Sequence, residues 1–292
     1  VQPPEPLEEW SHGGPWSADI VDGVLYGRGS TDNKSGVLAF NKAAKAFLQV
    51  RGEVPVSLKF LIEGEEEIGS PSFNGFLNEN KEKLAGDMVL VSDTGSPSPE
   101  QLVVTTGLRG LTALEVKVIG PKQDLHSGVH GGPLLNPLQA LAEICASLHD
   151  SDGCVGIPGF YDAVQEPEDW EREELKKMPL TESKYAEFLG VDHFHPPKGY
   201  SPLESLRFAP TLEFNGMGGG YQGDGSKTVI PSEAFVKITC RLVPNQTADE
   251  ITNLVKEAIE SRCPPQVRVE VTVTGGGDPY VVVPPGKPGA DL

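Results

Sequence analysis

The sequence predicts an α/β protein whose first part carries a mostly parallel sheet and whose second part is a smaller α+β domain. In roughly the first hundred residues, apolar strand-like segments alternate with helical segments in the order β-α-β-α-β. Such alternation is typical of a parallel sheet with helices on its faces. In the second part, alternating apolar positions flank helical stripes, which indicates an antiparallel sheet covered by helices.

In the first part, apolar periodicity and turn residues define the elements. They are, in order, a strand at 24–26, a helix from about Lys34 to Gly52, a strand at 56–62, a helical stretch around 72–84 and a strand at 88–91. Three strands make a small parallel sheet, and the Pro- and Gly-rich end of the sequence resembles a linker. We therefore expect this domain to be completed by further chain.

The second part repeats a strand-helix-strand plan. The predicted elements are strands at 114–118, 236–242 and 267–273, helices at about 135–149 and 251–259, and a weaker helix around 165–177. Thr247 and Glu250 have the spacing of a capping box at the start of the helix over 251–259. These patterns predict a small domain with a helix-covered antiparallel sheet.

Composition narrows the class of protein. The formal net charge of −18 argues against a nucleic-acid partner, which would require a basic surface. No run of about 18 apolar residues occurs, so we expect no membrane partner. The four cysteines are far apart and form no CxxC pair, which favours reduced thiols and a cytoplasmic location.

The acidic run Glu63–Glu67 follows a predicted strand, and two aspartates, Asp32 and Asp93, follow the other two. Ligands of open α/β sheets gather beyond the carboxyl ends of the strands. Several carboxylates buried together require cations or shared protons, so a metal site would explain the run. A solvated acidic loop explains it equally well, and Asp32 and Asp93 also fit a helix cap and an Asx-turn.

Two further residues could take part in chemistry. His126 lies in the glycine-rich segment 124–132, where a histidine can stabilise an oxyanion, bind a metal or cap a loop. Arg241 lies on the opposite face of its strand from the apolar residues and could hold a carboxylate, although arginines on strands are commonly surface residues.

Taken together, seven segments in order closely resemble the M20 metallopeptidase family, specifically its branch of cytosolic nonspecific dipeptidases and carnosine dipeptidases. They are 25–34, 63–70, 92–93, 107–110, 124–132, 227–231 and 241–245, preceded by Val1-Gln2-Pro3. The resemblance implies that Asp32 bridges two metal ions, Glu67 and Asp93 each bind one, and Glu66 is the general base. The ions would be two Zn²⁺, with Mn²⁺ as the alternative, and would activate a shared water.

The resemblance also implies that His126 stabilises the oxyanion from the partner subunit of a homodimer, while Arg241 and Thr228 hold the substrate's C-terminal carboxylate. The implied domains are a first catalytic segment at 1–107, a ferredoxin-like lid and dimerisation domain at 108–275, and a return into the catalytic domain at 276–292. The expected activity is hydrolysis of dipeptides or short peptides. The alternatives are an N-acyl-amino-acid deacylase or amidase, and a catalytically incomplete dimerising module.

The sequence departs from the family pattern in its ligand set. The family's His-x-Asp motif falls before the position of Val1, and its C-terminal histidine ligand has no counterpart here. Asn33 stands where the family often has Asp. None of these differences changes Asp32, Glu67 or Asp93, but they leave the substrate open.

Overall fold

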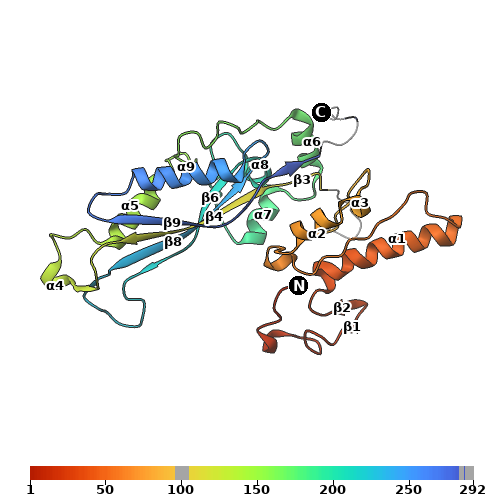
Figure 1. The fold of residues 1–292 in the computed structure, drawn as a ribbon, viewed down its shortest axis with the longest axis horizontal. Helices are drawn as coiled ribbons and strands as arrows, with labels where there is room; N and C mark the ends of the chain where they lie inside the picture. The colour runs from red at the N-terminus through yellow and green to blue at the C-terminus, as the bar shows by residue number, and fades with distance from the viewer. Residues whose placement is uncertain (96–104, 283–285, 287–292) are drawn as a thin grey trace. The chain divides into compact units, whose positions relative to one another are not determined.

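The structure is a computed structural model that describes residues 1–95, 105–282 and 286 (Figure 1). The chain divides into two compact units, Val1–Val103 and Val104–Leu292. In the described part of the chain, no helix combines the length and the apolar character needed to cross a membrane.

The first unit begins with a short hairpin followed by a long helix. Strands β1 (Asp19–Val21) and β2 (Val24–Tyr26) pair antiparallel around Asp22 and Gly23, which both have positive φ, as a two-residue hairpin turn requires. The π-helical turn η2 (Ser30–Lys34) leads into helix α1 (Ser35–Arg51), which ends at Gly52 with φ 78°. The predicted strand at 24–26 and the predicted helix from Lys34 are therefore confirmed.

The remaining elements of the first unit are short. They are η1 (Leu7–Glu9), η3 (Glu66–Ile68), α2 (Phe73–Glu79) and α3 (Lys81–Leu84). The last two occupy the helical stretch predicted around 72–84.

The parallel sheet predicted for this unit is not formed. Residues 56–62 and 88–91, expected as its strands, are irregular and pair with no strand among the described residues. Their apolar side chains are largely exposed, for example Met88 at 85% and Ile62 at 64%. Strands of a parallel sheet are stabilised by ladder partners and by helices on both faces. Without a paired neighbour these segments stay out of regular structure, and the strand prediction is wrong for them.

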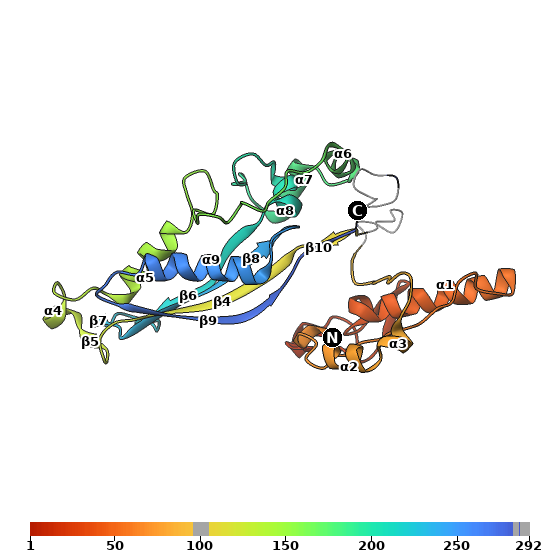
Figure 2. The same ribbon diagram turned by 45° about the horizontal axis from the view of Figure 1, so that its top comes forward.

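The second unit is built on a four-stranded antiparallel sheet. Its strands are β4 (Gly110–Ile119), β6 (Thr211–Gly219), β8 (Glu233–Leu242) and β9 (Arg268–Gly277), in the spatial order β6-β8-β4-β9. Helices α5 (Pro137–Ser147) and α9 (Ala248–Ser261) cover one face of this sheet (Figure 2). The helix-covered antiparallel sheet predicted for this part is present.

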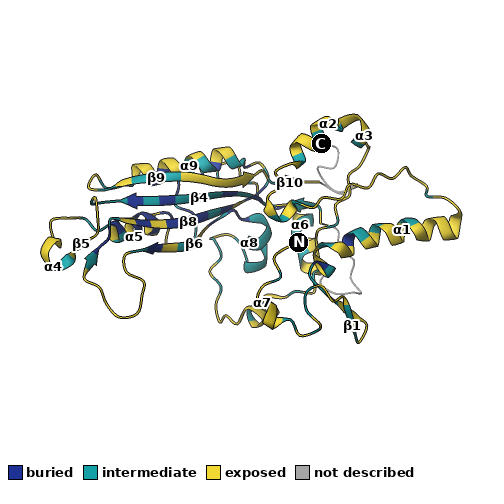
Figure 3. Cartoon of the chain, turned by 60° about the horizontal axis from the view of Figure 1, so that its bottom comes forward, coloured by how far each residue is buried: buried dark blue, intermediate teal, exposed yellow. Residues whose placement is uncertain are grey.

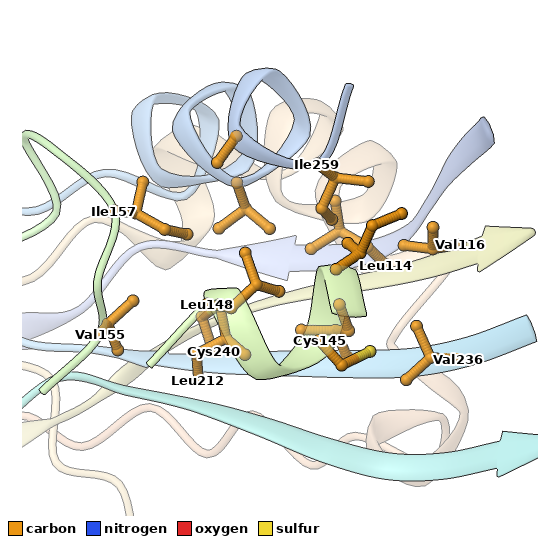
Figure 4. Packing of buried hydrophobic residues seen from close by; sticks show 14 of the residues in the cluster. Leu114, Val116, Cys145, Leu148, Val155, Ile157, Leu212, Val236, Cys240 and Ile259 are labelled. Atoms are coloured by element: carbon orange, nitrogen blue, oxygen red, sulfur yellow. The ribbon is translucent and has the colours of Figure 1, made fainter. Parts of the chain in front are cut away.

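The core lies between these two helices and the sheet (Figure 4). Alternate residues of β4 and β8 are buried, with Val116 and Val236 at 0% and 1% exposed. Their neighbours point to the other face, which remains open and carries cross-strand charge pairs such as Lys117 with Glu233 at 3.5 Å. Each buried Leu, Ile or Val contributes about 1.5–3 kcal/mol relative to an exposed one. The two-residue alternation in the sequence thus corresponds to a core face and an open face (Figure 3).

Smaller elements complete the second unit. They are α4 (Ser127–His130), α6 (Asp169–Lys177), α7 (Glu182–Leu189), α8 (Pro202–Phe208), and the paired strands β3 (Gly107–Leu108) with β10 (Tyr280–Val281) and β5 (Leu125–His126) with β7 (Val229–Ile230). Helix α6 confirms the weaker helix predicted around 165–177. Strand β6 and helices α7 and α8 were not predicted.

Candidate functional site

The acidic residues of the first unit occupy three separate segments. Asp32 lies in η2 directly after the hairpin, Glu66 and Glu67 lie in η3, and Asp93 lies in the irregular chain after residue 91. Asp32, Glu66 and Asp93 are exposed, whereas Glu67 is half-buried and accepts a hydrogen bond of 2.6 Å from the Gln2 side chain.

Asn33 joins two of these segments. Its amide nitrogen donates to the Asp93 carboxylate at 2.7 Å and to the Ser92 carbonyl, and its amide oxygen accepts from the Gly36 backbone at 3.2 Å. A Cβ atom at Gly36 would lie 2.6 Å from the Ser92 oxygen, so glycine permits this close approach. The sequence identified Asn33 only as a difference from the family, and its position next to Asp32 is the signal that could have revealed this role.

Neighbouring carboxylates shift the pKa of Glu66. Desolvation by neighbouring atoms raises the pKa of Glu66, and the negative charges of Glu67, Asp93, Asp32 and Glu63 raise it further. The charged groups that shift the pKa of Glu66 in the described part of the chain are thus carboxylates. A cation would neutralise this concentration of negative charge, and carboxylate oxygens are ligands for Zn²⁺ and Mn²⁺.

The donor chemistry of this cluster fits a metal site. Among residues 1–95, 105–282 and 286, however, no group of three or more His, Cys, Asp or Glu side chains lies close enough together to hold an ion. Asp32, Glu67 and Asp93 each lie within electrostatic range of Glu66. The spacing of Asp32, Glu67 and Asp93 in this structure is wider than that of a coordination shell.

In the second unit, His126 and Thr228 lie together although they are 102 residues apart. Strands β5 and β7 place His126 opposite Val229, and the imidazole Nε2 lies 3.2 Å from the Thr228 hydroxyl oxygen. The imidazole Nδ1 accepts a hydrogen bond of 3.0 Å from the Gly128 backbone, which caps the start of α4. Because Nδ1 accepts, the proton of the neutral ring lies on Nε2 and is directed at Thr228.

Strands β5 and β7 form the ribbon that carries this pair, and hydrogen bonds between Asp124 and Ser232 join its two chain segments. The Asp124 carboxylate accepts hydrogen bonds from the Ser232 amide at 2.9 Å and from its hydroxyl at 3.1 Å. These two bonds hold the pKa of Asp124 below its usual value. A further backbone bond runs from Ser127 to the Thr228 carbonyl at 3.1 Å. The His126 side chain is therefore exposed but rests on a fixed backbone.

Arg241 lies far from this pair within the unit. Arg241 is on β8, eight residues after Glu233, which is the first residue of that strand. At about 3.3 Å per residue, the two strand positions are roughly 26 Å apart. The structure thus brings His126 and Thr228 together within one chain but separates both from Arg241, which is exposed and lines a pocket at the other end of the sheet.

Comparison with known proteins identifies one peptidase family. Residues 1–284 match the model described as peptidase family M20/M25/M40. The human Beta-Ala-His dipeptidase is 33% identical over 286 residues, which are 96% of this chain and 56% of that protein. The Cys-Gly metallodipeptidase dug1 of Schizosaccharomyces pombe is 33% identical over 262 residues, 89% of this chain and 55% of that protein. The chain thus spans slightly more than half the length of these relatives.

A solved structure shares the fold over nearly the whole chain. The M20 family metallo-carboxypeptidase Sso-CP2 from Sulfolobus solfataricus has a TM-score of 0.84 and 34% identity, covering 97% of this chain and 63% of that one. The family match over most of the sequence agrees with the order of the motifs and with the α/β architecture. The chain belongs to peptidase family M20/M25/M40.

Proposed function

We propose that this chain carries the chemistry of a metal-dependent hydrolase that cleaves dipeptides or short peptides. The carboxylate cluster around Glu66 is the observation that supports this most directly, because carboxylates gathered at one site favour the binding of a cation. The names of similar proteins, Beta-Ala-His dipeptidase and Cys-Gly metallodipeptidase, point to dipeptides as the substrate class.

In this proposal, Asp32, Glu67 and Asp93 would hold the metal ions, two Zn²⁺ or alternatively two Mn²⁺. Bound metal ions would supply an activated water and a Lewis acid for the scissile carbonyl. Glu66 takes the proton from that water and delivers it to the leaving amine.

His126 donates its Nε2 proton to the developing oxyanion, while Arg241 and Thr228 hold the substrate's C-terminal carboxylate. One chain does not offer His126 and Arg241 to the same short substrate, because they lie at opposite ends of the sheet. This supports a homodimer in which His126 and Thr228 of one subunit act with Arg241 of the other. The expected mass in solution, measured by light scattering, is that of two chains.

The division into a catalytic segment at 1–107, a lid and dimerisation domain at 108–275 and a return segment at 276–292 is part of the same proposal. The element order β4-α5-β6-β8-α9-β9, with the strand order β6-β8-β4-β9, supports a ferredoxin-like two-layer sandwich for the lid. The cysteines are free, which supports a reducing compartment such as the cytoplasm.

The decisive experiment compares Glu66→Gln with Glu63→Gln in the whole protein. Bound metal is counted by elemental analysis, and hydrolysis of a dipeptide panel is measured beside N-acyl amino acids. Loss of a general base lowers kcat about a hundredfold or more. We expect this loss in Glu66→Gln with metal retained, and near-normal hydrolysis in Glu63→Gln. Activity confined to N-acyl amino acids would favour the deacylase alternative, and absence of metal would contradict the hydrolase proposal.

A further inference from the structure

The open face of the sheet in the second unit carries two arginines close together. Leu111 of β4 and Thr211 of β6 are both directly opposite Arg241 of β8. Arg109 lies in the link between β3 and β4, two positions before Leu111, and it is near enough to Arg241 for the two charges to interact. Both side chains line one pocket of about 390 Å³.

The pocket has the size and lining of a site for a small organic ligand. Its volume suits a group of amino-acid size. Opposite the sheet, Tyr185 and Phe194 form a stacked pair with ring centroids 5.6 Å apart and planes 10° apart, and both line the pocket. The lining thus offers two guanidinium groups and an aromatic wall formed by this pair.

Positive charge in the pocket is not balanced. Glu213 is the only acid among the described residues that line it. Burial, followed by repulsion from Arg241 and Arg207, lowers the pKa of Arg109, and Glu213 offsets only part of this effect. Neither the Arg109 nor the Arg241 side chain has a hydrogen-bond or ion-pair partner in the described part of the chain.

Arg109 is also available to a ligand. The guanidinium nitrogens are open to solvent, since Arg28 alone has a sealed and unpaired side-chain nitrogen among the described residues. A half-buried arginine with five free N–H donors gains most from a carboxylate, which can accept two of them in parallel. One ligand carboxylate on Arg241 would leave the N–H donors of Arg109 without an acceptor.

The geometry points to a pocket for the C-terminal residue of the substrate, with Arg109 selecting residues that carry a second carboxylate in the side chain, such as glutamate or aspartate. This inference rests on the proposed function only for the identity of the bound molecule. Arg241 takes the main-chain carboxylate and Arg109 takes the side-chain carboxylate. The aromatic wall packs against the methylene groups between them.

The test is calorimetric titration of the chain with N-acetyl-L-glutamate and N-acetyl-L-glutamine, which differ by one charge at equal shape. A charge-assisted pair is expected to favour the glutamate derivative about tenfold or more. Arg109→Gln should lower the affinity for the glutamate derivative by the same factor and leave that for the glutamine derivative unchanged. Arg268→Gln, on an exposed arginine of β9, is the control and should change neither.

Arg109→Lys keeps the positive charge and should keep part of the preference for the glutamate derivative. It therefore allows the test to be made even if Arg109→Gln unfolds. An equal affinity for both derivatives in the unaltered chain would overturn the inference, as would a preference that survives Arg109→Gln. Binding needs neither metal nor turnover, so the two proposals can fail separately. A charge preference without any hydrolysis by the whole protein would leave the pocket standing and remove the peptidase function.

Discussion

At the scale of single residues, the charge of the Asp124 carboxylate stabilises the β5–β7 ribbon that carries His126. The Ser232 hydrogen bonds keep the pKa of Asp124 low in the folded chain, below the value of about 3.9 expected when unfolded. The charged form therefore stabilises the fold above that ordinary value. This stabilisation is lost as the pH falls through the lower pKa of the folded state.

Asp124→Asn should accordingly lower the free energy of unfolding near neutral pH, with the difference from the unaltered chain narrowing below about pH 4. Denaturant unfolding at about pH 3 and about pH 7 measures this difference. Asp192→Asn, at an exposed aspartate, serves as the control and should follow the unaltered chain. A constant difference between Asp124→Asn and the unaltered chain at both pH values would contradict the assignment.

At the scale of elements, helix α9 has an N-terminus specified by local chemistry. The Thr247 hydroxyl accepts from the Glu250 amide at 3.3 Å, and the Asp278 carboxylate accepts from the Ala248 amide at 2.8 Å. Thr247→Ala should cost about 1 kcal/mol of stability, while Thr247→Ser keeps the acceptor and should cost much less. Thermal unfolding measures both, and equal losses would argue against the cap.

The elements that the sequence predicted are those with a local signal. Helix α9 has a cap and an apolar stripe, and β4 and β8 have strict alternation, so each could be identified alone. Strand β6 was missed because its second half, Gly216–Gly219, has glycine at three of its four positions and so shows no alternation. The segments 56–62 and 88–91 have strand-like alternation, but a strand also needs a partner, which a local pattern does not report.

The candidate site was predictable only through motif resemblance. No periodicity relates His126 to Thr228, because their contact depends on the pairing of two short strands distant in sequence. Asp124 and Ser232, which close that ribbon, and Asn33, which joins Asp93, were not assigned a role. Their roles arise from hydrogen bonds across separate segments, and a single sequence does not record such bonds.

At the scale of the whole molecule, burial is distributed unequally between the units. All apolar side chains in the core belong to the second unit, whereas Gly29 and Gly36 are the only buried residues among positions 1–95. Local opening is easiest where few apolar contacts oppose it. We expect amide hydrogen exchange to be slow in β4 and β8 and much faster in α1. Equal protection of α1 and β4 would contradict this expectation.

The central position of β4 has a consequence for how the chain is made. Strand β4 ends at residue 119, but its first partner, β8, begins at residue 233 and its second, β9, at residue 268. A ribosome adding about 5–20 residues per second needs on the order of ten seconds to cover the first interval. Throughout that time the apolar face of β4 is synthesised and unpaired. The nascent chain therefore passes through a stage in which a chaperone has a defined segment to shield.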